Sequence, residues 1–177
     1  MPARRDGPGA GPLPVPFLSQ MRVPNGWANY ACGPTSLAMV MSYSGRPPPS
    51  VVQVALRAGT QKSSAGTSHS GLIHAAQTYG FSPHQGSGWV GLSQALAAGK
   101  PVVAHITCAP LHNRPYGYGG GHYVVITGLI RDPAGHVTQV VCNDPATSFE
   151  SKGKAIRYSA AEFERAWGSK GHWFLSL

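Results

Sequence analysis

The sequence predicts an α+β fold in which an N-terminal helical part packs on a C-terminal antiparallel sheet. Apolar residues recur at helical spacing in the first half, whereas β-branched residues dominate several runs in the second half. The predicted strands are residues 101–107, 122–130 and 137–143, followed by a short strand at 172–177. Because the helices precede the strands instead of alternating with them, we expect antiparallel pairing.

The predicted helices follow from spacing, caps and breakers. The first begins at Cys32 and carries Leu37, Val40 and Met41 on one apolar face. Shorter helices are predicted at residues 51–58, 70–79 and 92–98. Near the C-terminus, a capping box that starts at Ser159 predicts one further helix.

Composition indicates one globular domain. With 177 residues, 42% of them hydrophobic, the chain is long enough to bury a full core. Residues 1–14 are rich in Pro and Gly, so we expect a flexible tail followed by a domain over 15–177. The net charge is +8, but the basic residues are scattered and form no nucleic-acid-binding motif. We therefore expect a solvated basic surface and no nucleic-acid partner.

The cysteines and histidines show no metal-binding pattern. Three cysteines without a C-x-x-C motif do not make a disulfide framework, and no Cys/His set has zinc-ligand spacing. Cys108 and Cys142 each end a β-like run, and we expect buried thiols there rather than a bridged pair. His69 and His74 have the character of surface residues on a helix. We expect neither a metal nor a cofactor.

No membrane or export signal is evident. The longest apolar runs, near residues 101–106 and 123–130, are too short to cross a bilayer. The N-terminus lacks the apolar core of a signal peptide. We expect a soluble protein, and the sequence leaves open whether it is cytoplasmic or secreted and what its oligomeric state is.

Cys32 is the cysteine placed for nucleophilic chemistry. It opens a predicted helix, where unpaired backbone N–H groups and the positive end of the macrodipole favour a thiolate. Pro34 fits an early helical position, because its missing N–H costs nothing there. A thiol nucleophile also needs a base, and His is the usual one.

His122 is the candidate base. It follows Gly119-Gly120-Gly121 and begins a strongly apolar strand, so a polar side chain would stand beside backbone that a substrate can approach. A histidine that merely caps the strand is the alternative interpretation. The hairpin that follows His122 favours the interpretation of His122 as a catalytic base. Its turn, Asp132-Pro133-Ala134-Gly135, fits a type I turn with a G1 bulge.

That turn sets the pairing register of the two strands, and the register decides on which face Asp144 lies. Ala146 would lie opposite His122, with Asp144 two residues away on the same face and within reach of it. A plain two-residue turn would place the two side chains on opposite faces. Asp144 would then orient the imidazole of His122. The alternative is that Asn143-Asp144-Pro145 is an ordinary turn signal.

An oxyanion needs hydrogen-bond donors, and the backbone N–H of Cys32 supplies one. Gln20, upstream of Cys32, is the candidate for the second, with Asn25 and Asn29 as possible substitutes. The substrate-binding candidates are Trp27, Tyr30 and Gly121, and the loop at residues 113–121 is a candidate gate.

Blocks of sequence around these residues resemble, in order, the C39-like (papain-like) cysteine peptidases. The resemblance covers about residues 15–177. It is carried by Pro16-Phe17-Leu18-Ser19-Gln20, by residues 31–40 around Cys32, by Gly99-Lys100-Pro101-Val102-Val103, by residues 121–128, by Asn143-Asp144-Pro145 and by residues 159–167.

The resemblance implies a papain-like fold with Cys32 as nucleophile, His122 as base, Asp144 as orienting residue and Gln20 as oxyanion donor. The Gln20–Cys32 spacing is longer than in bacteriocin-leader peptidases of transporters, and no transporter domain follows, so a free-standing bacterial type is expected. We expect a thiol hydrolase acting on a peptide or related amide. The alternatives are an acyl or peptidyl transferase with the same triad, or a non-catalytic peptide-binding module.

Overall fold

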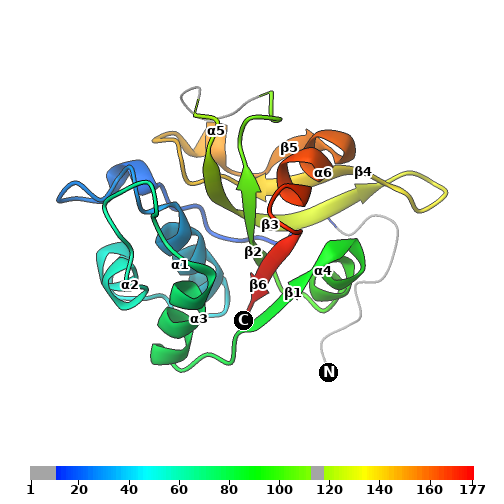
Figure 1. Ribbon diagram of the computed structural model, residues 1–177. Coiled ribbons are helices and arrows are strands. Elements are labelled where there is room, and N and C mark those ends of the chain that lie inside the picture. The colour runs from blue at the N-terminus through cyan, green and yellow to red at the C-terminus, as the bar shows by residue number, and fades with distance from the viewer. Residues whose placement is uncertain (1–10, 113–117) are drawn as a thin grey trace.

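A six-stranded antiparallel sheet lies between two groups of helices in the computed structural model, which describes residues 11–112 and 118–177 (Figure 1). The strands run in the order β1-β6-β2-β3-β4-β5, and every neighbouring pair is antiparallel. They are β1 (His84–Ser87), β2 (Val102–Thr107), β3 (Gly121–Arg131), β4 (Val137–Asn143), β5 (Ile156–Ser159) and β6 (Trp173–Ser176). The predicted α+β class is therefore confirmed.

The helices cover both faces of this sheet. They are the 3-10 helix η1 (Gln20–Arg22), α1 (Cys32–Tyr43), α2 (Val51–Arg57), α3 (His69–Thr78), α4 (Gly88–Ala97), α5 (Glu150–Gly153) and α6 (Ala160–Gly168). Helices α1 to α3 share one hydrophobic core with Val103 and Val125 of the sheet. Helices α4 and α6 share the other core with Val102 and Val124, whose side chains point to the opposite face.

Helix α1 is more deeply buried than its sequence pattern predicts. The pattern indicates one apolar face, yet residues 33–41 are all buried. The sheet covers one side of α1, while α2 and α3 pack on others. A helix enclosed on several sides needs small or apolar residues all round, and Gly33, Thr35, Ser36 and Ala38 meet this need.

Two short edge strands and the start of α4 were not predicted. β1 is largely polar, and it is recognisable only by its pairing with β6. β5 pairs with β4 alone and forms the other edge of the sheet. An edge strand buries little side-chain surface, so its sequence shows no strong apolar alternation. α4 begins at Gly88, four residues before the predicted start at Leu92.

The hairpin between β3 and β4 has the predicted turn. Gly135 has φ 89°, and its N–H donates to the carbonyl of Asp132 at 2.9 Å. The Asp132 N–H donates to the His136 carbonyl at 2.9 Å, which places these two residues opposite each other as expected. Both features follow from the Asp-Pro-Ala-Gly turn sequence.

Two irregularities then shift the register and cancel. Arg131 pairs with Val137, but Ile130 pairs with Gln139, which leaves Thr138 as an extra residue in β4. Farther along, Gly128 pairs with Val141 and Ile126 with Cys142, which leaves Thr127 as an extra residue in β3. One extra residue on each strand restores the register that the turn predicts. His122 and Asp144 therefore keep their predicted relative position.

The N-terminal segment is bonded to this second bulge. The N–H of Leu13 donates to the carbonyl of Thr127 at 2.8 Å, and Leu13 packs against the core beneath α1. The chain is thus attached to the sheet two residues before Val15, where the predicted domain begins. Residues 1–10 of the predicted tail lie outside the described residues.

The buried thiols follow expectation. Cys108 and Cys142 are both buried, the latter inside the core under α6. Burial raises the pKa of Cys142 well above its ordinary value, with a smaller contribution from the charge of Asp144. Cys142 is therefore a neutral thiol at physiological pH and a poor nucleophile.

Asn143 should contribute strongly to stability, because its buried amide bridges two backbone segments. Nδ2 donates to the Val15 carbonyl at 3.2 Å, and Oδ1 accepts the Ala155 N–H at 2.9 Å. We expect Asn143→Ala to lower the free energy of unfolding by about 2 kcal/mol, because it leaves both backbone groups unsatisfied. Chemical denaturation measures this, with Asn29→Ala, the same change at an exposed site, as the control. Equal effects of the two variants would contradict the bridging role.

Candidate active site

Cys32 is the first residue of α1 and is half-buried. The residue before it, Ala31, has no side-chain group that could cap the helix. No N-cap side chain therefore competes with the Cys32 sulfur for the free N–H groups of the first turn. Backbone N–H groups of Tyr123 and Gly33 hydrogen-bond the sulfur. The first turn of the helix and the neighbouring strand therefore both stabilise negative charge at Sγ.

The sulfur reaches β3 because α1 occupies the space beyond the end of β4. Pairing between β3 and β4 ends at Val125 and Asn143, so the backbone of Tyr123 has no partner from β4. Ser36 Oγ donates to the Tyr123 carbonyl at 3.2 Å. A Cβ on Gly33 would lie 3.2 Å from the Tyr123 ring, so only glycine allows this close approach without displacement.

His122 and Asp144 form a buried pair. His122 Nε2 lies 2.8 Å from Asp144 Oδ1, and each side chain is only 4% exposed. Oδ1 also accepts the Ala146 N–H at 2.9 Å, which holds the carboxylate in an Asx turn. The bond to Asp144 leaves Nδ1 of the imidazole available, and the His122 side chain is hydrogen-bonded to Cys32. The side chain predicted as base thus contacts both predicted partners.

The charges of this cluster favour a thiolate and an imidazolium. Burial lowers the pKa of His122, but the charge and hydrogen bond of Asp144, assisted by Cys32, raise it well above its ordinary value. Burial likewise raises the pKa of Cys32, yet the hydrogen bond and charge of His122 outweigh it and lower that pKa. The two groups titrate as a coupled pair, so each stabilises the charged form of the other.

Gln20 is held between the other parts of the site. Its side chain is buried in η1, and Nε2 donates one hydrogen to the Ala28 carbonyl at 2.7 Å. Its backbone N–H donates to the carbonyl of Pro145, the residue after Asp144, at 2.9 Å. Within residues 11–112 and 118–177, Nε2 makes no second hydrogen bond, so its other hydrogen is free to donate. Gln20 is thus attached to the loop that leads into Cys32 and to the turn that carries Asp144.

The predicted substrate-binding residues lie in different environments. Trp27 is 9% exposed and packs with Val23, Ala31 and Ala55, so most of its ring surface is used in packing. Tyr30 is half-buried, and Gly121 is exposed at the start of β3. Of the candidate gate at 113–121, residues 113–117 lie outside the described part of the chain.

A group of rings beside Tyr123 was not predicted. His69, at the start of α3, stacks on Trp173 with 3.8 Å between ring centroids, and its Nε2 lies 2.8 Å from His105 Nδ1. His105 in turn stacks on Tyr123 at 4.5 Å. His69 is half-buried because residues distant in sequence cover part of its ring, so the expectation of a surface residue holds only in part for it, whereas His74 is exposed. The alternation of β2 could have indicated that His105 and Val103 share a face.

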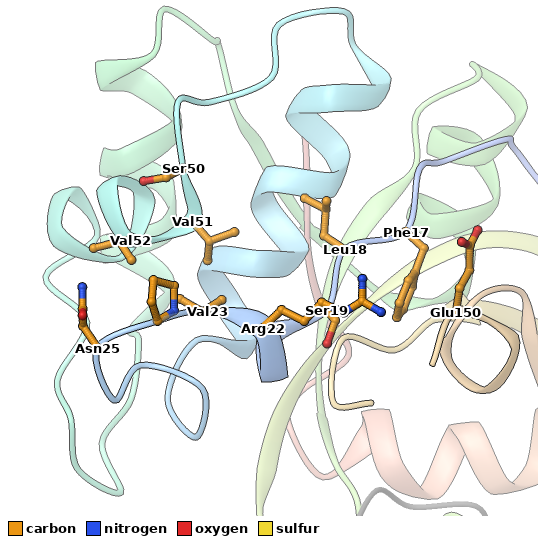
Figure 2. A pocket seen from close by; sticks show the side chains of 11 residues that line it. Phe17, Leu18, Ser19, Arg22, Val23, Asn25, Ser50, Val51, Val52 and Glu150 are labelled. Carbon is orange, nitrogen blue, oxygen red and sulfur yellow. The ribbon is translucent and has the colours of Figure 1, made fainter. Parts of the chain in front are cut away.

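A groove of about 550 Å³ lies between the segment at residues 17–25 and the start of α2. Figure 2 shows its lining, in which Val23 lies near Val51 of α2, while Phe17 lies beside Arg22 and Glu150 at the other end. The lining includes Ser19 but none of Gln20, Cys32, His122 and Asp144. The groove therefore adjoins the segment that carries Gln20 without including the reacting thiol.

Neither a metal cluster nor a membrane span is found in the described residues. Among residues 11–112 and 118–177, no three His, Cys, Asp or Glu side chains are grouped as metal ligands. Within the same ranges, no helix has both the length and the apolar composition of a bilayer span.

Comparison with known proteins identifies similar sequences and folds. The sequence profile of the Peptidase_C39 like family matches residues 12–172. A comparison with curated protein sequences gave no significant match.

Solved structures with the same fold include three peptidases. A protein from Bacillus anthracis described as a C39-like peptidase is 22% identical, with a TM-score of 0.67 over 92% of this chain and 94% of that one. A double glycine motif protease from an AMS/PCAT transporter, solved in complex with the leader peptide, is 23% identical. Its TM-score is 0.62, and the match covers 93% of this chain and 91% of that one. The peptidase domain of Streptococcus ComA is 22% identical. Its TM-score is 0.60, and the match covers 83% of this chain and 90% of that one.

Alkylation of Cys32 by iodoacetamide should be fast near neutral pH, because its pKa is lowered. The rate should rise with pH through that pKa and level off above it. In His122→Ala only burial and backbone contacts remain, so the pKa should rise and the rate at pH 6 to 7 should fall more than about tenfold. Peptide mass mapping measures alkylation at each cysteine.

His74→Ala is the matched control, since it removes an exposed histidine from α3. Its alkylation profile should coincide with that of the unchanged protein. A profile for His122→Ala that also coincides would show that His122 does not activate the thiol.

Proposed function

This chain belongs to the C39-like peptidase family, and on that premise we propose that it is a cysteine peptidase working through an acyl-enzyme on Cys32. The observation that carries the proposal is the position of the buried His122 side chain, bonded to Cys32 on one side and to Asp144 on the other. A histidine that only capped β3 would not need both partners. The arrangement supports a nucleophile, a base and an orienting carboxylate.

In the first half of the reaction, the Cys32 thiolate attacks the carbonyl carbon of the scissile bond. The carbonyl oxygen becomes negative and accepts hydrogen bonds from the Cys32 N–H and from the second hydrogen of Gln20 Nε2. When this intermediate collapses, the C–N bond breaks and the imidazolium of His122 gives its proton to the leaving amine. The product is a thioester on Cys32.

In the second half, His122 is neutral and takes a proton from water. The resulting hydroxide attacks the thioester carbonyl, and the same donors hold the second oxyanion. Cys32 leaves as a thiolate, which the restored imidazolium stabilises. Throughout, Asp144 keeps the ring orientation by holding Nε2, so that Nδ1 faces the sulfur.

A peptide substrate is favoured over other amides by the comparison with solved structures. The AMS/PCAT transporter protease was solved in complex with a leader peptide. Shared fold supports a peptide-sized site in this chain. Cleavage at a double glycine does not follow from the fold alone, because identity to these proteins is only 22–23%.

Peptide turnover should depend on Cys32 absolutely and on Gln20 strongly. Incubation with a peptide library, followed by mass spectrometry, should reveal cleaved products that are missing with Cys32→Ala. Gln20→Ala should lower kcat by about 10²- to 10³-fold with a smaller change in KM, because the lost donor acts on the transition state.

Gln77→Ala serves as control, since it makes the same change at an exposed position of α3 outside the site. Cleavage that survives in Cys32→Ala would overturn the proposal. Products joined to an added amine, in place of free acid, would identify a transferase with the same acyl-enzyme.

A further inference from the structure

The first residue of β3, Gly121, is exposed and directly precedes His122, although the two residues point to opposite faces of the strand. A Cβ built on Gly121 would lie 3.2 Å from His105 Nε2 and 3.6 Å from Lys170 Nζ. Glycine has no such atom, and Gly121 is exposed. Two nitrogen atoms from β2 and from the end of α6 therefore face the same piece of accessible backbone, immediately before His122.

Lys170 carries a charge that no described carboxylate neutralises. It is half-buried two residues after the end of α6, and no ion pair involves it within residues 11–112 and 118–177. Glu164, on the same helix, does not pair with Lys170. Its Oε2 accepts a hydrogen bond from Trp89 Nε1 at 2.7 Å, and its Oε1 lies 2.9 Å from His172 Nε2. The negative end of α6 favours an ammonium there, but does not replace a carboxylate.

His105 offers a second, well-oriented polar atom. Its ring is stacked on Tyr123, and Nδ1 lies 2.8 Å from His69 Nε2. When His69 donates in this bond, His105 must carry its own proton on Nε2, the atom that lies nearest to Gly121. Burial and the charges of His69, Lys170 and His122 lower the pKa of His105 to about 4, so this donor is neutral near pH 7.

We propose that Lys170 and His105 bind a carboxylate of the substrate at Gly121, close to the scissile bond. The Lys170 ammonium supplies charge and His105 Nε2–H supplies a directed hydrogen bond. This inference rests on the proposed function and adds a substrate class to it: peptides that carry a carboxylate near the cleaved bond. The carboxylate belongs either to an acidic side chain or to the peptide's C-terminus.

Chain geometry sets how near that carboxylate must be. Adjacent Cα atoms are about 3.8 Å apart, and Gly121 directly precedes the residue whose ring contacts the Cys32 sulfur. An extended substrate advances about 3.3 Å per residue. Because the two positions lie on opposite faces of β3, side-chain lengths add to this spacing, and the carboxylate should sit within about three residues of the carbonyl that Cys32 attacks.

Three affinity labels of similar size test the site without requiring turnover. They are N-iodoacetyl-glutamine amide, which is neutral, N-iodoacetyl-glutamate α-amide, with a side-chain carboxylate, and N-iodoacetyl-glutamine, with a terminal carboxylate. In each, the Cys32 thiolate displaces iodide and forms a thioether. Rates would be measured by mass spectrometry on the unchanged protein, Lys170→Gln and Lys100→Gln. Lys100 is the matched control, because it is exposed and precedes the opposite end of β2.

We expect one carboxylate label to react about three- to tenfold faster than the neutral label, because an opposite charge at a partly buried site is attractive. Lys170→Gln should abolish this preference and leave the neutral rate unchanged, whereas Lys100→Gln should preserve it. The preferred label identifies which carboxylate is bound. Equal rates for all three labels, or a preference that survives in Lys170→Gln, would overturn the site alone. Failure of the neutral label itself would overturn the activated thiol, and the site with it.

Discussion

The site depends on one junction, where the start of helix α1 meets the part of β3 that extends beyond the end of β4. A strand whose neighbour has ended exposes backbone N–H and C=O groups that must find other partners. In this protein α1 provides them: Ser36 bonds the Tyr123 carbonyl, and the Cys32 sulfur receives the Tyr123 N–H. The same contact that satisfies the strand therefore places the thiol next to His122.

The turn at the end of β4 connects the remaining parts to this junction. Asn143 holds the N-terminal segment at Val15, Asp144 holds His122, and the carbonyl of Pro145 holds Gln20. Three consecutive residues thus fix the positions of three different segments. Because these contacts are buried or partly buried and mutually connected, the loss of one would move the others.

Charge is distributed unevenly around the junction. The chain has 14 basic residues and only six acidic ones, and one of those acids, Asp144, is used inside the site. The imidazolium of His122 is offset by Asp144 and by the Cys32 thiolate, whereas Lys170 has no such partner among the described residues. An acidic group on the substrate would supply the missing charge, which links the basic composition of the chain to the proposed peptide specificity.

Much of the site's framework was predictable because it depends on short-range physics. The helix start at Cys32 follows from local spacing and Pro34, and the hairpin turn follows from Asp132 to Gly135. The turn alone predicts that His122 and Asp144 share a face. That prediction holds only because the bulges at Thr138 and Thr127 cancel, and no local sequence signal marks either bulge.

By itself, the sequence determined the fold class, the main helices and strands, and the identity of the thiol, imidazole and carboxylate that meet. Only the tertiary structure decided the edge strands β1 and β5, the burial of α1 on several sides, and the stacking of His69 on Trp173 and against His105. It also placed Lys170 beside Gly121. The physical reason is the sequence separation of the interacting residues. Turns, caps and periodicity depend on residues a few positions apart, whereas these contacts join distant segments that only the packed sheet brings together.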